Sequence, residues 1–141
     1  MTRLLAAAAL VACLAACGGT EATGPVPTLK ISSPTAGAQV TLGSDQHKTV
    51  NVEFATTGFK TQTCVNSTEN CGHLHVLIDG TDCGSPYNNH ATTSPAAALF
   101  DGCSRPTGAH TLTLELHHDD HSAIKNAAGA VVSSSVSFTT L

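Results

Sequence analysis

The chain has little charge and few aromatic side chains. Of its 141 residues, 11% are charged and 4% are aromatic, and tryptophan is absent. Six residues are Lys or Arg and ten are Asp or Glu, so the formal net charge is −4. Proteins that bind the phosphate backbone of nucleic acids carry clusters of basic side chains. This composition therefore argues against a nucleic-acid partner.

The sequence also lacks the short motifs of common enzymes. It contains no G-x-S-x-G, no H-E-x-x-H and no glycine-rich phosphate loop. No segment after the N-terminal region repeats its apolar residues with the 3.6-residue period of an amphipathic helix. We therefore predict that the protein is not an enzyme. An enzyme that uses the histidines described below is the weaker alternative.

The N-terminal region predicts export. A short basic start precedes an apolar run from Leu4 to Ala16, which is shorter than the roughly 20 residues that span a bilayer as a helix. Such a run is typical of a secretory signal peptide. It ends in Leu14-Ala-Ala-Cys17, which resembles the bacterial lipobox, in which the cysteine becomes a lipid-modified N-terminus. A plain signal peptide with an incidental cysteine is the alternative.

Together with the composition and length of the remaining chain, this resemblance predicts three segments. Residues 1–16 are expected to be the signal peptide, residues 17–27 the lipidated Cys17 with a flexible tether, and residues 28–141 one folded domain. Lipid on Cys17 would make the membrane a partner, because two or more acyl chains give stable anchoring. The expected location is the bacterial cell envelope, at the outer membrane or cell surface.

Four further cysteines lie in the expected domain. An even number of cysteines in an exported chain indicates disulfides, because that compartment is oxidising. Three pairings are possible, and we favour the two that close local loops. A zinc site built from four cysteines is the alternative, but the C-x₂-C pairs of such sites are missing. The favoured pairs are Cys64–Cys71 and Cys83–Cys103.

Residues 28–141 show the two-residue alternation of β-strands, punctuated by Gly, Pro, Asn and Asp. About seven short strands predict an all-β, immunoglobulin-like antiparallel β-sandwich, with a β-barrel as the alternative. The stretches LKISSPTAGAQVTL and GAVVSSSVSFTTL resemble the first and last strands of bacterial Ig-like domains. The expected strands lie near residues 28–33, 39–42, 48–55, 73–79, 96–100, 110–117 and 131–140.

Histidines on two of these strands are the main functional signal. His73 and His75 point away from the apolar side of the 73–79 strand. In the 110–117 strand, His117 occupies one of the alternate positions whose side chains are expected to point outward. Antiparallel pairing of these strands would bring their histidine-bearing ends together, with His121 arriving from the following loop. Imidazole is a ligand for copper and zinc, with nickel also possible. Such a site would lose its ion toward pH 5 as the rings become protonated.

The sequence thus predicts a copper or zinc site formed by His73, His75, His117 and His121. Glu115 and Asp79 have the parity to accept hydrogen bonds from the ring nitrogens that do not face the ion. His110 is expected to have a structural role at the start of its strand. No partner is predicted for His47 or for His90.

Two family resemblances bear on this site. The stretches GHLHVLIDG and GAHTLTLELHHDDH are similar to a small group of exported bacterial domains that carry G-x-H-x-H-L-L-I-D followed by G-x-H-T-L-x-L. This similarity implies the fold more than an activity. The H-x-H on a sandwich strand also resembles copper/zinc superoxide dismutases. The chain departs from them, because it lacks their G-x-H-x-H-x-x-G-D stretch and a zinc loop. The matching positions in the first group are Gly72, His73, His75, Ile78, Asp79, Gly108, His110, Thr111, Leu112, Leu114 and His121.

The function predicted from sequence is therefore binding of copper or zinc by a lipid-anchored Ig-like domain, for capture and storage or delivery. The alternative belongs to another class: an adhesion or scaffold module that binds a protein or a glycan without metal. Its contact surface would be residues 80–109, which are rich in Pro and Asn and closed by a disulfide.

Overall fold

The protein is an all-β sandwich of two sheets. The computed structural model describes residues 25–64, 70–84 and 89–141. In these ranges no helix has the length and apolar character needed to cross a membrane. The strands are β1 (Thr28–Ser33), β2 (Gln39–Val40), β3 (Val50–Thr57), β4 (His73–Ile78), β5 (His90–Ala91), β6 (Ala96–Ala98), β7 (Gly108–His117) and β8 (Ser133–Thr140).

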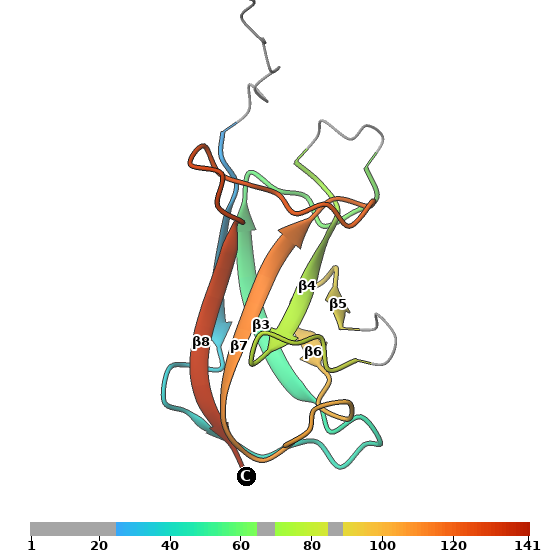
Figure 1. The fold of residues 1–141 in the computed structure, drawn as a ribbon, viewed down its shortest axis with the longest axis vertical. Coiled ribbons are helices and arrows are strands. Elements are labelled where there is room, and N and C mark those ends of the chain that lie inside the picture. The colour runs from blue at the N-terminus through green and yellow to red at the C-terminus, as the bar shows by residue number, and fades with distance from the viewer. Residues whose placement is uncertain (1–24, 65–69, 85–88) are drawn as a thin grey trace, which may run out of the picture.

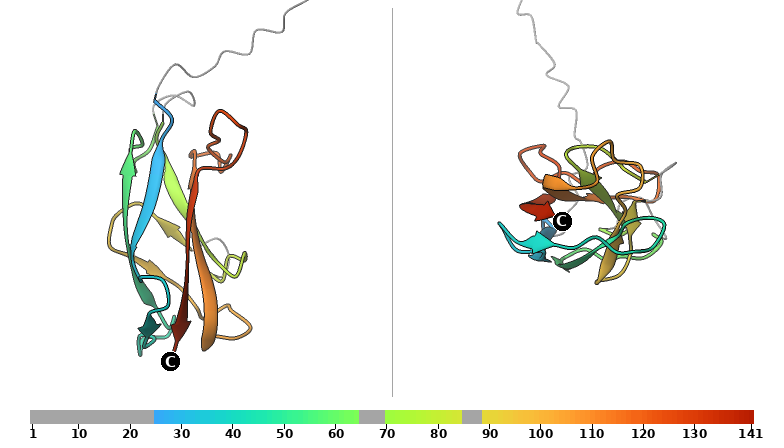
Figure 2. Two further views of the ribbon diagram at one scale, coloured as in Figure 1. Left: turned by 90° about the vertical axis from the view of Figure 1, so that its left-hand side faces the viewer. Right: turned by 90° about the horizontal axis from the view of Figure 1, so that it is seen from below.

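The strands form a three-stranded sheet in the order β1-β3-β6 and a five-stranded sheet in the order β2-β8-β7-β4-β5 (Figure 1). All neighbours are antiparallel except β2 and β8, which are parallel. The two layers face each other in the side view (Figure 2, left). This arrangement confirms the immunoglobulin-like β-sandwich predicted from the alternation.

The core lies between the inner faces of the sheets. β3, β4 and β7 each place every second side chain inward, so that buried and more exposed residues alternate along them. Burial of each such side chain contributes about 1.5–3 kcal/mol relative to exposure. The residues at these positions, joined by two phenylalanines from other segments, are Val50, Val52, Phe54, Leu74, Val76, Ile78, Leu112, Leu114, Leu116, Phe100 and Phe138.

β4 and β7 pair in the predicted antiparallel register. His73 at the start of β4 lies opposite His117 at the end of β7, and His75 lies opposite Glu115. The start of β4 and the end of β7 therefore meet at one end of the sandwich (Figure 1).

Two disulfides and a short edge strand complete the fold. The favoured disulfides, Cys64–Cys71 and Cys83–Cys103, both form. β5 was not expected from the sequence. This two-residue strand forms the edge of the sheet next to β4 and places His90 opposite His75.

Candidate metal centre

Four histidines converge on the outer face of the five-stranded sheet, where β4 begins. His73 and His75 come from β4, His90 from the edge strand β5, and His121 from the turn after β7. Because Leu74 and Val76 fill the core, the alternation of β4 turns its two imidazoles outward. Neighbouring strands lie about 4.8 Å apart, so directly opposed imidazoles can reach one another.

The ring nitrogens are close enough to share one ion. One nitrogen from each of the four rings lies within 4.8 Å of the other three. His75 Nε2 is 3.1 Å from His73 Nε2 and 3.1 Å from His121 Nδ1. The rings of His73, His75 and His90 are half-buried, and that of His121 is exposed. We name these four residues the histidine group.

These distances suit a transition-metal ion. Nitrogen ligands bind zinc at about 2.0–2.1 Å, which places the nitrogens of a tetrahedral site roughly 3.3 Å apart. The two contacts at 3.1 Å are near this separation. His90 Nε2 is buried without a hydrogen-bond partner among the described residues. A buried nitrogen of this kind is costly unless it meets a donor or an ion.

The environment keeps the rings of His73 and His75 neutral, as metal ligands must be. The pKa of His73 is lowered to about 4, first by burial and then by positive charge on His90, His121 or His117, against the opposing effect of Asp119. The pKa of His75 is likewise lowered to about 3, first by burial and then by positive charge on the neighbouring rings. At pH 5 both rings are therefore still neutral.

The pKa of His90 is also lowered, first by burial and then by positive charge on His121, while Asp82 opposes the shift. A ring that remains neutral keeps a nitrogen lone pair for a metal. The histidine group therefore presents lone pairs from both strands at neutral pH.

His117 lies beside the histidine group and is not part of it. Its ring stacks on that of His75, with centroids 3.8 Å apart and an interplanar angle of 10°. Its Nδ1 donates a hydrogen bond to the backbone carbonyl of His121 at 2.8 Å, and its Nε2 lies 3.2 Å from Glu115 Oε2. Both nitrogens are thus engaged. The set of ring nitrogens that lie within 4.8 Å of one another contains His90 and not His117, which the sequence had suggested as the fourth ligand.

Through these contacts Glu115 and His117 support the turn that carries His121. The carboxylate of Glu115 faces the His117 ring, as the parity of β7 predicted. The turn is closed by backbone hydrogen bonds from His118 to Ser122 and from His121 to His118. His121 adopts a left-handed backbone conformation there, with φ of 64°. The position of this fourth ring therefore depends on turn geometry as well as on strand pairing.

Gly72 permits the close approach of β4 to β7. Its φ of 139° lies in a region that side chains disfavour. A Cβ at this position would overlap the backbone carbonyl oxygen of His117. The residue immediately before His73 therefore has to be glycine for the two histidine-bearing strand ends to meet.

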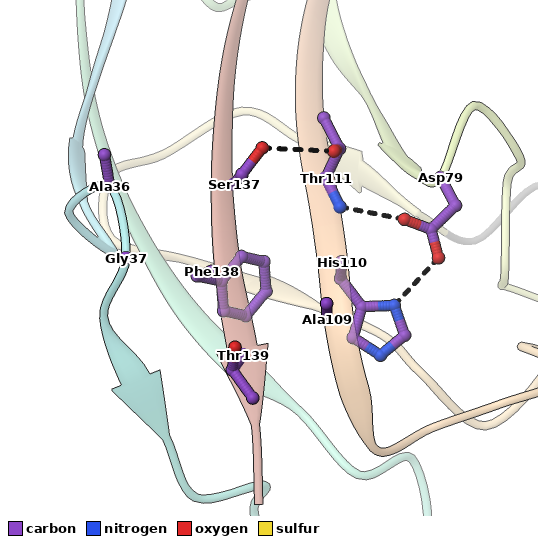
Figure 3. A pocket seen from close by; sticks show the side chains of 9 residues that line it. All are labelled: Ala36, Gly37, Asp79, Ala109, His110, Thr111, Ser137, Phe138 and Thr139. Carbon is purple, nitrogen blue, oxygen red and sulfur yellow. Dashed lines mark hydrogen bonds and ion pairs between the residues drawn. The ribbon is translucent and has the colours of Figure 1, made fainter.

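Asp79 does not hold a ring of the histidine group, contrary to the sequence-based expectation. It follows the last residue of β4, whereas His73 is the first, and its φ is 52°. Its Oδ2 accepts a hydrogen bond from His110 Nδ1 at 2.8 Å, and its Oδ1 accepts one from the Thr111 backbone amide (Figure 3). Partial burial raises the pKa of Asp79, but these hydrogen bonds outweigh burial and lower it overall.

His110 has a structural environment, as expected. Its side chain is 1% exposed and packs edge-on against Phe100 in the core. The partner is the Asp79 carboxylate rather than the turning backbone. A shallow pocket beside this pair is lined by β7, β8 and residues 36–37 (Figure 3).

His90 is the member of the group that sequence analysis missed. A strand of two residues is too short to show alternation, and the preceding residues 85–88 lie outside the described part of the chain. The sequence therefore held no signal that His90 pairs with His75. Cys17 and the segments 1–16 and 17–24 likewise lie outside the described residues.

Comparisons with known proteins found a weak structural similarity and no sequence relative. No protein-family model matches the chain, and no curated protein matches it. Among solved structures, fibronectin(III)-like modules of Clostridium thermocellum CbhA are similar, with 11% sequence identity and a TM-score of 0.45. The similarity covers 80% of this chain and 95% of the module. At these values it says nothing about function.

Proposed function

We propose that the protein binds a transition-metal ion, copper or zinc, through His73, His75, His90 and His121. The observation that carries this proposal is the mutual distance of the four ring nitrogens, all within 4.8 Å of one another. Four imidazoles suit copper and zinc better than magnesium or calcium, which prefer oxygen ligands. The proposal keeps three of the four ligands expected from sequence and takes His90 in place of His117.

The proposed role is capture and storage or delivery of the ion, without bond chemistry. Structural zinc sites have four protein ligands, whereas catalytic sites have three and keep one position open for water or substrate. The histidine group offers four nitrogens to one ion. If the N-terminal region acts as a lipoprotein signal, lipid on Cys17 would hold this site at the surface of the bacterial envelope.

Calorimetric titration of Cu²⁺ and Zn²⁺ into the purified protein tests the proposal. We expect one ion per chain, and loss of that binding in a His73→Ala/His75→Ala double variant. His47→Ala is the matched control, because His47 is an exposed histidine that contacts Asp101 and Gln46 instead of the histidine group. Equal heats from the double variant and the unchanged protein would refute metal binding at the histidine group. The scaffold function, with its contact surface on residues 80–109, would then replace it.

A further inference from the structure

The ligand atoms of the histidine group are all nitrogens, and this determines which ions it prefers. All four candidate ligand atoms are imidazole nitrogens, and neither a sulfur nor a carboxylate belongs to the group. Imidazole is a borderline ligand that suits Zn²⁺ and Cu²⁺, whereas thiolate and thioether sulfur select Cu⁺. The following inference rests on the proposed function and specifies its ligand.

The rest of the domain supplies no soft donor either. Met1 is the only methionine of the chain. The four cysteines of the described residues are paired in two disulfides, so none offers a thiolate. One of these bridges ends at Cys71, two residues before His73. A sulfur close in sequence to the histidine group is thus already bonded to another sulfur.

Carboxylates lie near the histidine group without belonging to it. Asp119 acts electrostatically on His73, and Asp82 acts on His90, in each case favouring positive charge on the ring. Glu115 faces the His117 ring that stacks on His75. Coulomb attraction scales with the charge of the ion. The energy of attraction between these carboxylates and a divalent cation is therefore about twice that with a monovalent cation at the same place.

We propose that the histidine group selects divalent copper or zinc and discriminates against monovalent copper. The donor atoms provide the chemical preference, and the nearby carboxylates add a preference for the higher charge. A protein with this selectivity takes up Cu²⁺ or Zn²⁺ under oxidising conditions and leaves Cu⁺ to carriers with sulfur ligands.

Competition titrations with chromophoric chelators test the selectivity. Cu²⁺ and Zn²⁺ are titrated in air, and Cu⁺ is titrated without oxygen against bicinchoninate. For the unchanged protein we expect the dissociation constant for Cu⁺ to exceed that for Cu²⁺ at least tenfold. His121→Met places a thioether at the exposed position of the group and should lower the ratio of these constants at least tenfold. His47→Met, which adds the same thioether elsewhere, should leave the ratio unchanged.

The outcomes separate this inference from the proposed function. Binding of Cu²⁺ together with equal or tighter binding of Cu⁺ by the unchanged protein would overturn the selectivity and leave the metal site in place. An unchanged ratio in His121→Met would also overturn it. Failure to bind any of the three ions would overturn both the selectivity and the metal site.

Discussion

Replacing His90 by Ala removes one of the four nitrogens of the histidine group while leaving the core intact. The His90 ring lies on the outer face of the sheet, and the buried residue of β5 is Ala91. The substitution therefore tests the ligand that the structure adds to those expected from sequence. It should leave the fold of the metal-free protein unchanged.

The magnitude follows from sharing the binding free energy among the ligands. Structural zinc sites bind with roughly 10–16 kcal/mol, so one of four ligands contributes about 3 kcal/mol. Since 1.4 kcal/mol corresponds to a tenfold change, loss of His90 should weaken zinc binding roughly 100-fold. At a zinc concentration of 100 times the original Kd, the stabilisation of the folded state falls from about 2.7 to about 0.4 kcal/mol.

Thermal unfolding with and without zinc measures this difference. For a domain of this size, 1 kcal/mol shifts Tm by about 4 °C, so zinc should raise Tm by about 11 °C in the unchanged protein and about 2 °C in His90→Ala. His47→Ala should retain the full shift, because His47 lies outside the histidine group. A zinc-induced shift in His90→Ala equal to that of the unchanged protein would refute the assignment of His90 as a ligand.

Three further predictions concern pH, the approach of the strands and the N-terminus. Because the pKa values of His73 and His75 are lowered to about 4 and about 3, the unfolded chain binds protons below pH 6.5 that the native protein does not. The free energy of unfolding of the metal-free protein should thus decrease from pH 6.5 toward pH 4, and urea unfolding should show a smaller decrease in a His73→Gln/His75→Gln variant; equal slopes would contradict the shifts. Gly72→Ala should lower Tm and weaken zinc binding more than Gly80→Ala, because both glycines have positive φ but only the first would overlap backbone atoms across the sheet. Cys17→Ser should abolish incorporation of labelled fatty acid in bacterial cells, and undiminished labelling would refute the lipid anchor.

The alternation of apolar residues was sufficient to predict the sandwich and one half of the site. Leu74 and Val76 had to face the core, so the orientation of His73 and His75 followed from the sequence. The order of strands in an immunoglobulin-like sandwich then placed the start of β4 beside the end of β7, as the register of His73 opposite His117 confirms.

The other half of the site depends on short elements without periodicity. β5 consists of two residues, and its pairing with β4 is what makes His90 a neighbour of His75. Parity correctly put His117 near the group. It could not show that the His117 Nδ1 donates to the His121 backbone, because that contact arises from the turn after β7. Such turns are set by local backbone conformation rather than by hydrophobic pattern.

The expectation that Asp79 would hold a ring of the histidine group differs from the structure for a related reason. Alternation along β4 gives it the same parity as His73 and His75, but the strand ends at Ile78 and Asp79 has a left-handed conformation. Its carboxylate consequently reaches His110 on β7. Parity predicts the face of a side chain only while the strand continues.

Anomalous diffraction at the zinc edge from crystals of the zinc-loaded protein tests the metal site most directly. The structure predicts one zinc ion within about 2.1 Å of a ring nitrogen from each of His73, His75, His90 and His121. A fully occupied zinc ion held by other residues, or zinc-loaded crystals without an anomalous peak at the histidine group, would contradict it.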